Sequence, residues 1–206
     1  MNKLVIIGAS GHGKVIADIA EKNGYSDIVF LDDNPEAKQC GKYDVVGGSE
    51  HISAYKCADF IVAIGNAGVR RRIQDELVRK GINVITLVHP SAVIAQDVKI
   101  GDGTIVAAGA VINPSVEIGQ GCIVNTCASV DHDCKIGDFV HISVGAHVAG
   151  TVKINENTWV GAGATISNNL EITGDCMIGA GSVVVKSITE KGTYMGVPAR
   201  KRGEKQ

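Results

Sequence analysis

The sequence is dominated by aliphatic residues that recur every six positions through its C-terminal half. From residue 94 onward, sixteen consecutive positions of this series hold only Ile or Val. They are Ile94, Ile100, Val106, Ile112, Ile118, Val124, Val130, Ile136, Ile142, Val148, Ile154, Val160, Ile166, Ile172, Ile178 and Val184. An α-helix would space its apolar residues by three and four, and a flat strand would alternate with a period of two. An unbroken period of six predicts a parallel β-helix of hexapeptide repeats.

A second series of mostly small residues lies four positions after each member of the first, from Thr104 to Ser182. One large and one small inward residue per hexad fit a narrow triangular prism, with three hexads in each coil. Glycine-rich stretches such as Asp102-Gly103 and Gly161-Ala162-Gly163 are expected at its corners, where a missing Cβ relieves strain. Three cysteines belong to the small series and are predicted to be buried packing residues: Cys122, Cys134 and Cys176.

Residues 1–88 follow a different pattern and predict a small parallel sheet of the Rossmann-like α/β class, followed by the β-helix domain at 89–206. Strands are expected at residues 3–7, 28–31, 60–64 and 84–88, and helices at 15–23 and 70–80, each closed by a glycine. Three predicted strand ends lead into polar or glycine-rich loops, and ligands of such sheets bind beyond these ends. The glycine-rich turn at residues 8–13 suits an anion such as pyrophosphate, although its glycines do not follow the G-x-G-x-x-G order.

Composition excludes several classes of function. The net charge is −2, the basic Arg200-Lys201-Arg202 segment is expected to be a solvated terminus, and nucleic acid is not an expected partner. No signal peptide or membrane-spanning stretch is visible, so the protein is expected to be cytoplasmic. The six cysteines form no C-x-x-C pair, and no metal site is expected.

Seven short motifs resemble a family of bacterial acetyltransferases that acylate nucleotide-linked amino sugars. They are Gly8-Ala-Ser-Gly-His-Gly13, Phe30-Leu-Asp-Asp33, Ala63-Ile-Gly-Asn66, Val88-His-Pro-Ser-Ala92, Val130-Asp-His-Asp133, His141-Ile-Ser-Val-Gly-Ala146 and Gly196-Val-Pro-Ala-Arg200. That family includes enzymes acting on UDP-4-amino-4,6-dideoxy sugars on the route to bacillosamine, and has sialic acid O-acetyltransferases as relatives. The resemblance covers nearly the whole chain. It implies a left-handed prism, acetyl-CoA as acetyl donor, and a homotrimer with each active site between two prisms.

The resemblance also implies roles for individual residues. His132 matches the catalytic base and Asp133 the acidic neighbour that raises its basicity, a position held by Glu in the best-matched relatives. The positions that match the nucleotide-sugar site are Ser10, Gly11, His12, Asp32, Asp33 and Gly65. Those that match the acetyl-CoA groove are His141, Gly150, Ala162 and Ala180.

The chemistry of acetyl transfer needs a base, because an amine attacks a thioester only when it is unprotonated. His132 follows the inward Val130 near a corner, so its side chain can face outward. Without the resemblance, His132 ranks only slightly above His141, because Asp131 and Asp133 flank it. The oxygen of the tetrahedral intermediate needs a backbone N–H, and Gly150 is the candidate donor.

Three functions stay open on the sequence. The first is an N-acetyltransferase acting on a nucleotide-linked amino sugar, and the second an O-acetyltransferase acting on sialic acid or another glycan. The third is a non-catalytic trimeric scaffold, against which the His132-Asp133 pair argues. The nucleotide-type loops of the N-terminal part favour the first. An outward residue such as Trp159 would gain from burial in a homotrimer.

Overall fold

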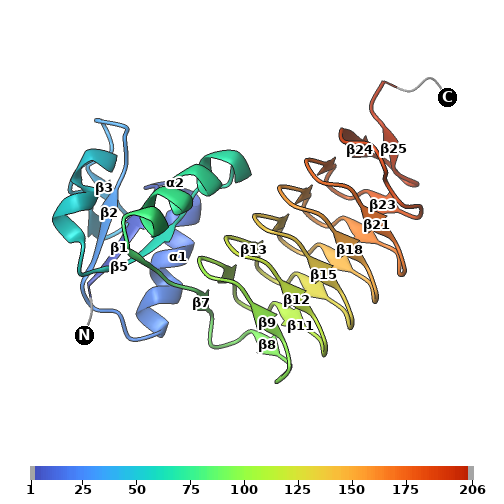
Figure 1. Cartoon of the computed structure of the whole chain (residues 1–206), viewed down its shortest axis with the longest axis horizontal. Helices are drawn as coiled ribbons and strands as arrows, with labels where there is room; N and C mark the ends of the chain where they lie inside the picture. Colours follow the sequence, from blue (N-terminus) through green and yellow to red (C-terminus); the bar gives the residue numbers. More distant parts are fainter. Residues whose placement is uncertain (1–2, 204–206) are drawn as a thin grey trace. The chain divides into compact units, whose positions relative to one another are not determined.

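The computed structural model describes residues 3–203, and the chain divides into two compact units between Pro90 and Ser91. Residues 3–90 form an α/β unit, and residues 91–203 form a left-handed parallel β-helix (Figure 1). Both parts of the predicted fold class are confirmed.

The α/β unit is built on a parallel sheet with the strand order β2-β1-β5-β6. Its strands are β1 (Leu4–Ile7), β2 (Ile28–Leu31), β5 (Asp59–Val62) and β6 (Asn83–Val84). All four residues of β1 are buried aliphatics, as expected of a central strand covered on both faces. Ile7 aligns with Leu31 of β2 and Val62 of β5, so the carboxyl ends of these three strands lie at one edge of the sheet.

Both helices of this unit begin earlier than the sequence predicts. α1 (Gly11–Lys22) begins directly after Ser10, so two of the motif glycines lie in its first turn rather than before it. A Cβ at Gly13 would lie 2.4 Å from the Gly8 carbonyl oxygen, which shows how closely α1 approaches the loop after β1. α2 (Ala67–Arg79) begins at Ala67 because the Asn66 side chain accepts a hydrogen bond from the Val69 N–H (3.0 Å) and caps the helix.

Three further differences separate this unit from the sequence prediction. The strand expected at residues 84–88 is two short strands, β6 and β7 (Leu87–Val88). The strand expected at 60–64 ends at Val62, because the Ile64 carbonyl accepts a hydrogen bond from a buried arginine instead. The sequence analysis missed the hairpin of β3 (Gln39–Cys40) and β4 (Tyr43–Asp44) and the 3-10 helix η1 (Ser49–Tyr55).

The β-helix consists of two-residue strands, one in each hexad. They are β8 (Val93–Ile94), β9 (Lys99–Ile100), β10 (Ile105–Val106), β11 (Val111–Ile112), β12 (Glu117–Ile118), β13 (Ile123–Val124), β14 (Ser129–Val130), β15 (Lys135–Ile136), β16 (His141–Ile142), β17 (His147–Val148), β18 (Lys153–Ile154), β19 (Trp159–Val160), β20 (Thr165–Ile166), β21 (Glu171–Ile172), β22 (Met177–Ile178) and β23 (Val183–Val184). Ile112 pairs with Ile94 and Val130, which shows that three hexads complete one coil of 18 residues. The second residue of every strand is the inward aliphatic, and each is buried from Val106 onward. Each such side chain contributes about 1.5–3 kcal/mol through burial.

The prism has three faces, which we name by a residue or residue type that each presents outward. The Trp159 face holds β10, β13, β16, β19 and β22, followed by β24 (Thr193–Met195) and β25 (Arg200–Lys201). The His147 face holds β8, β11, β14, β17, β20 and β23, and the lysine face holds β9, β12, β15, β18 and β21. The three predicted packing cysteines are buried free thiols in the interior.

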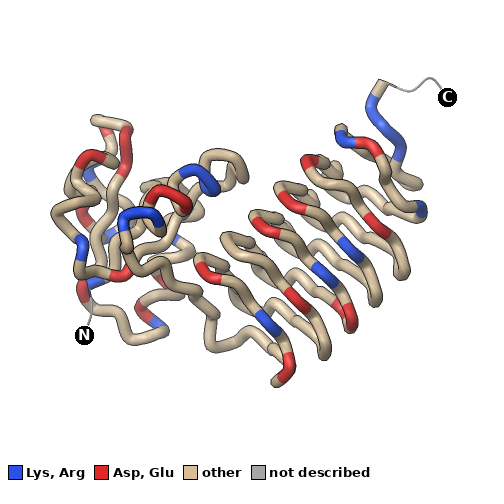
Figure 2. Tube along the Cα trace, viewed as in Figure 1, with Lys and Arg blue, Asp and Glu red and all other residues tan. Residues whose placement is uncertain are grey.

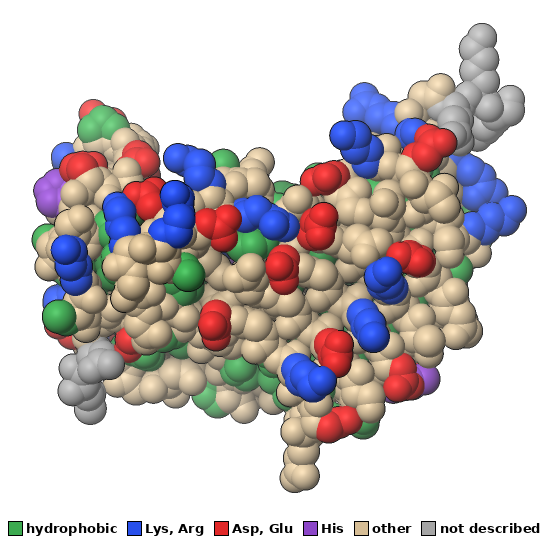
Figure 3. Space-filling model, in the orientation of Figure 1, with side chains coloured by type: hydrophobic (Ala, Val, Ile, Leu, Met, Phe, Trp, Pro, Cys, Tyr) green, Lys and Arg blue, Asp and Glu red, His purple; other side chains and the backbone are tan. Residues whose placement is uncertain are grey.

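Charged side chains gather on the lysine face. Its strands begin with Lys99, Glu117, Lys135, Lys153 and Glu171. Lys99 forms an ion pair with Glu117, and Lys153 forms one with Glu171, each at 2.8 Å between successive coils. Figures 2 and 3 show these charges recurring from coil to coil. The strands of the His147 face instead begin with Val93, Val111, Ser129, His147, Thr165 and Val183. The lysine face is therefore suited to solvent exposure. The outward strand positions of the His147 face hold no Asp, Glu, Lys or Arg side chain.

Each corner of the prism from the β9–β10 corner to the β22–β23 corner contains a residue in the left-handed backbone region. These residues recur every six positions from Gly103 to Gly181, with φ between 55 and 73°. Six are glycines, as predicted for corners, and eight are not: Ser115, Cys127, Asp133, Phe139, Thr151, Asn157, Asn169 and Asp175. Asn and Asp tolerate this conformation better than most side chains. Asp133 therefore stands at a corner, where its carboxylate can fold back on the residue before it.

Candidate functional site

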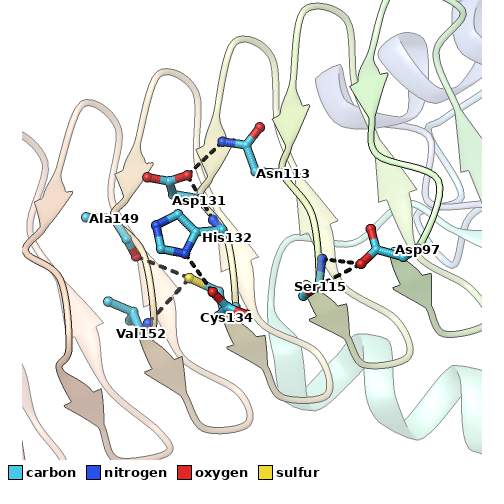
Figure 4. A network of polar contacts seen from close by, with 9 residues as sticks. Asp97, Asn113, Ser115, Asp131, His132, Cys134, Ala149 and Val152 are labelled. Atoms are coloured by element: carbon cyan, nitrogen blue, oxygen red, sulfur yellow. Dashed lines mark hydrogen bonds and ion pairs between the residues drawn. The ribbon is translucent and has the colours of Figure 1, made fainter.

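His132 occupies the corner between β14 of the His147 face and β15 of the lysine face (Figure 4). The imidazole Nδ1 and the Asp133 Oδ2 are 2.7 Å apart. The carboxylate accepts a hydrogen bond from Nδ1–H, so this contact favours the tautomer in which Nε2 has no hydrogen and is able to take a proton. Both side chains are more than half exposed, so a ligand can reach the ring.

The environment of His132 makes it a stronger base. The hydrogen bond to Asp133 is the main cause that raises the pKa of His132 above its ordinary value, and the charge of Asp131 adds to it. An imidazole with a raised pKa is protonated more readily by an attacking amine.

Gly150 lies in the same corner column as His132, one coil farther along the prism. A Cβ at Gly150 would lie only 2.6 Å from the His132 Nε2, so the missing side chain leaves the space that the ring fills. Among residues 3–203, the Gly150 N–H has no hydrogen-bond acceptor. The structure thus brings together three residues that the sequence analysis assigned to catalysis: His132, Asp133 and Gly150.

His141 lies on the Trp159 face and is largely buried, with 8% of its surface exposed. Its ring centroid lies 4.6 Å from that of Trp159, and its Nε2 lies 3.3 Å from the Asn125 Nδ2. The Trp159 Nε1–H donates to the Ser143 Oγ at 2.7 Å. Trp159, expected from the sequence to gain from burial against a neighbouring chain, also has partners within its own prism.

Ala162 and Ala180 occupy one column at the corner between the Trp159 face and the His147 face. Both are exposed, and the half-exposed Val144 precedes them in the same column. These three residues form a narrow apolar strip next to Ser143 and the contacting rings of His141 and Trp159. The strip offers no hydrogen-bonding side chain, so it suits an apolar part of a ligand.

One prism does not bring all the predicted residues together. His132 and Gly150 lie at one edge of the His147 face, whereas the alanine strip and His141 lie at or beside its other edge. Each prism therefore carries two separate groups of candidate residues.

In the α/β unit, the loops at the carboxyl ends of β1, β2 and β5 carry the remaining predicted residues. Ser10 precedes α1 but its side chain does not cap the helix, and Gly11 is the first helical residue. The Gly65 carbonyl accepts a hydrogen bond from the Arg70 Nη1 at 2.8 Å. The N–H groups at the start of α1 favour an anion at this edge of the sheet.

Asp32 and Asp33 organise these loops through their carboxylates. Asp32 accepts hydrogen bonds from the backbone N–H groups of Ala9 (2.7 Å) and Asn34 (2.9 Å), and Asp33 accepts one from the Ser49 N–H (2.7 Å). Both residues also line a pocket of about 170 Å³ together with Gly8, Ile52, Val69, Arg72 and Glu76. The two aspartates thus shape this pocket whether or not they touch a ligand.

The sequence analysis missed Arg70, which is fully buried in the first turn of α2. Its Nη1 donates to the carbonyl oxygens of Ile64 (2.7 Å) and Gly65 (2.8 Å), which fixes the loop after β5. Burial, followed by the charge of Arg70, lowers the pKa of His12 to about 4. The only sequence signal was an arginine shortly after the Gly65-Asn66 loop.

We expect His12 to make the protein less stable as the pH falls from 6.5 towards 4. The unfolded chain takes up a proton on His12 in this range, whereas the folded chain does not. Protonation therefore stabilises the unfolded state relative to the folded state. The loss amounts to at most about 3 kcal/mol, given a folded pKa of about 4. Urea unfolding of the wild type and of a His12→Gln variant at several pH values measures it. The His12→Gln variant should lose less stability than the wild type over this pH range, and a His147→Gln control should lose as much as the wild type. Equal pH dependence of the wild type and His12→Gln would contradict the prediction.

Within residues 3–203, no group of three or more His, Cys, Asp or Glu side chains is placed to hold a metal ion. No helix in this range has the length and apolar character needed to cross a bilayer.

Comparison with known proteins defines the class. A family model described as the PglD N-terminal domain matches residues 3–77, and one described as bacterial transferase hexapeptide (six repeats) matches residues 85–114. UDP-N-acetylbacillosamine N-acetyltransferase of Bacillus subtilis (strain 168) is 37% identical over 113 residues, which cover 52% of this chain and 51% of that protein. The chain thus matches about half the length of this curated relative.

Several solved structures match almost the whole chain. The acetyltransferase domain of PglB from Neisseria gonorrhoeae FA1090 is 38% identical with a TM-score of 0.93, covering 98% of this chain and 100% of that one. It has also been solved in complex with acetyl coenzyme A. PerB from Caulobacter crescentus, in complex with CoA and GDP-perosamine, is 32% identical with a TM-score of 0.93, covering 98% of each chain.

The fold and the matches define a hexapeptide-repeat transferase with a PglD-type N-terminal domain. The chain belongs to the N-acetyltransferase family that includes the PglB acetyltransferase domain and PerB.

Proposed function

We propose that this protein transfers the acetyl group of acetyl-CoA to the amine of a nucleotide-linked amino sugar, with His132 as the general base. The observation that carries the proposal is the arrangement of His132, with Nδ1 held by Asp133 and Nε2 placed beside Gly150. The relatives support both substrates, since PerB binds CoA and GDP-perosamine and the PglB domain binds acetyl coenzyme A. A UDP-4-amino-4,6-dideoxy sugar is the acceptor we favour, because the curated relative from Bacillus subtilis is named for a UDP-linked sugar.

The reaction follows from these groups in two steps. The amine nitrogen attacks the thioester carbonyl while the His132 Nε2 takes its proton, and Asp133 stabilises the imidazolium that forms. The Gly150 N–H donates to the oxygen that becomes negative in the tetrahedral intermediate. When the C–S bond breaks, the imidazolium returns the proton to the leaving thiolate, so free CoA thiol and an amide are the products.

We assign the nucleotide sugar to the loops of the α/β unit and the acetyl-CoA to the prism. Ser10, Gly11, His12, Asp32, Asp33 and Gly65 surround the carboxyl ends of β1, β2 and β5, where helix N–H groups favour a pyrophosphate. The apolar strip of Ala162 and Ala180 beside His141 fits the uncharged pantetheine arm of acetyl-CoA. Both substrates are products of cytoplasmic metabolism, so we propose that the protein acts in the cytoplasm.

Thiol release from acetyl-CoA tests this function. The purified protein is assayed against 4-amino sugars linked to UDP, GDP and dTDP, and against free sialic acid. We expect release with a nucleotide-linked amino sugar, and least with sialic acid. Release with sialic acid alone would instead support the O-acetyltransferase alternative.

We further propose a homotrimer in which the His132 edge of one prism meets the Ala162 edge of the next. A cyclic, head-to-tail contact joins two different surfaces, which is what the separated residue groups require. The His147 face lies between these edges and presents Val93, Val111, Thr165 and Val183 without an Asp, Glu, Lys or Arg at its outward strand positions. Burial of this face would remove apolar surface from water.

Sedimentation should therefore show a trimer at micromolar concentration. Thr165→Lys places a charge on the His147 face and is expected to dissociate the trimer and abolish turnover together. Lys153→Thr is the matched control on the lysine face and should leave the trimer intact. A wild-type protein that sediments as a stable monomer would contradict both the trimer and the shared active site.

A further inference from the structure

The turn that carries His132 is held to the preceding coil by a carboxylate that the proposed reaction does not use (Figure 4). Asp131 Oδ1 accepts a hydrogen bond from the Asn113 Nδ2 at 2.7 Å and another from the backbone N–H of His132 at 2.8 Å. Asn113 and Asp131 occupy the same position of successive coils. One carboxylate oxygen thus connects the base-bearing residue to the side chain of Asn113 in the preceding coil.

Carboxylates join successive coils elsewhere in the prism without any relation to a base. Asp97 accepts hydrogen bonds from the Ser115 N–H (2.8 Å) and the Ser115 hydroxyl (3.0 Å), and Asp138 accepts one from the Gln120 N–H (3.0 Å). These contacts supply the coil-to-coil bonding that a prism needs. Asp131 differs because its backbone donor is the residue that carries the imidazole.

The position of Asp131 also affects the charge around the imidazole. The neighbouring coils place Pro114 and Gly150 beside His132 in its corner column, and neither of these residues is charged. Asp131 and Asp133 are thus the charged groups that act on the ring, and both raise the pKa of His132. The Asn113 amide and the His132 N–H lower the pKa of Asp131 itself, which keeps this carboxylate ionised while the imidazole titrates.

Residues that surround Asp133 are uncharged in the same way. Ser115 and Thr151 precede and follow it in its own column, and the thiol of Cys134 is buried, which raises the pKa of that thiol and keeps it neutral. In these two corner columns, no charged side chain of the adjacent coils competes with the two aspartates.

We propose that Asp131 is a positioning residue for His132: clamped by the Asn113 amide, its carboxylate fixes the turn that carries the imidazole and places a second negative charge beside it. The inference rests on the role proposed for His132. Asp133 sets the tautomer through Nδ1, whereas Asp131 holds the backbone and acts on the ring only through space. The two carboxylates therefore have different effects when removed.

Two variants separate the contributions of Asp131. Asp131→Asn keeps an oxygen that can accept both hydrogen bonds but removes the charge, and Asn113→Ala keeps the charge but removes the clamp. Asp97→Asn is the matched control, because it changes a coil-bridging carboxylate that does not touch the His132 turn. The pKa of His132 is obtained from the pH dependence of hydrogen exchange at C2 of its imidazole. The exchange takes place in the intact enzyme and is then measured by mass spectrometry of the peptide that contains His132. The value of kcat/KM is measured in parallel.

Asp131→Asn should move the titration of His132 and the rising limb of kcat/KM to lower pH. Asn113→Ala should lower the kcat/KM plateau on the order of 10-fold through loss of positioning. Asp97→Asn should change neither, at a comparable melting temperature. The proposal is overturned if Asp131→Asn and Asn113→Ala both behave like Asp97→Asn, or if their losses of activity only follow a loss of folded protein. The exchange measurement needs no substrate. The shift in the His132 titration can therefore be tested even if the proposed acetyl transfer is wrong, and the two failures can be told apart.

Discussion

Replacing His132 by alanine is expected to lower kcat/KM by roughly 10² to 10⁴, the usual contribution of a general base. The imidazole is the only group of the corner whose free nitrogen can take the proton of an attacking amine, since its Nδ1 is engaged by Asp133. The rising limb of the pH profile of kcat/KM should disappear in this variant. The amine of the substrate can titrate in the same range, so the change on mutation is the informative result.

Asp133→Asn should cost less than His132→Ala and should move the limb to lower pH. The hydrogen bond that His132 donates to Asp133 is the main cause of the raised pKa of His132, so its removal lets the ring lose its proton at lower pH. The two effects should be less than additive, because the carboxylate acts only through the imidazole.

Two other histidines serve as controls for the base. His147 is exposed on the next coil, where its Nδ1 lies 2.8 Å from the Ser129 Oγ, and His147→Ala should leave the pH profile unchanged. His141→Ala should act mainly through the affinity for acetyl-CoA, with some loss of stability because the ring is buried against Trp159. Near-native activity of His132→Ala, together with abolished turnover of His141→Ala at saturating acetyl-CoA, would mean that His141 is the base.

Gly150→Ala is expected to lower kcat/KM by about 10²-fold, because a displacement of about 1 Å in a catalytic group has effects of this size. The new Cβ would lie 2.6 Å from the His132 Nε2, so the ring must move away from the position that Asp133 holds. Alanine keeps the backbone N–H, so this variant tests the space beside the ring separately from the hydrogen bond to the oxyanion. The loss is measured by steady-state kinetics at saturating nucleotide sugar.

Asn168→Ala provides the matched control, because residue 168 lies in the same corner column one coil beyond Gly150 and two coils from His132. In addition, the double variant of His132→Ala and Gly150→Ala should be no slower than His132→Ala alone, since the glycine acts on the imidazole. A double variant slower than His132→Ala by the full cost of Gly150→Ala would show that the glycine works independently of the base.

Much of the prism followed from the sequence, because a strict period of six admits few folds. The inward series from Val106 to Val184 is buried as predicted, and every hexad forms one strand. The corners were only half foreseen: glycine signals the left-handed backbone, but eight corners use other residues, and no simple residue pattern marks them. The corner position of Asp133 is one of these.

The α/β unit was harder to predict because tertiary contacts decide its boundaries. α1 begins at Gly11 because Gly13 allows the helix to approach the Gly8 carbonyl, a contact between residues that the local sequence does not reveal. β5 ends before Ile64 because the buried Arg70 takes the Ile64 carbonyl group. Short hairpins such as β3-β4 have too few residues to show a period.

The candidate site was predicted residue by residue, but its division between two edges of the prism was not. Hexapeptide spacing places His132, Gly150 and their neighbours in columns 18 residues apart, so their meeting could be deduced once three hexads per coil were known. The clamp between Asn113 and Asp131 follows the same rule. The contacts of Trp159 with His141 and Ser143 depend on side-chain rotamers, which the spacing does not set.

The most direct measurement offers the protein two acceptors that differ in one atom group: a UDP-4-amino sugar and the same nucleotide sugar with a hydroxyl in place of the amine. Each is incubated with acetyl-CoA, and mass spectrometry of the nucleotide sugar is followed together with thiol release. The proposed function predicts one acetyl group on the amino sugar, released thiol in equal amount, and no acetylation of the hydroxyl compound, with His132→Ala losing the reaction. Acetylation of the hydroxyl compound at a similar rate, or thiol release that does not depend on the sugar, would contradict transfer to an amine by this site.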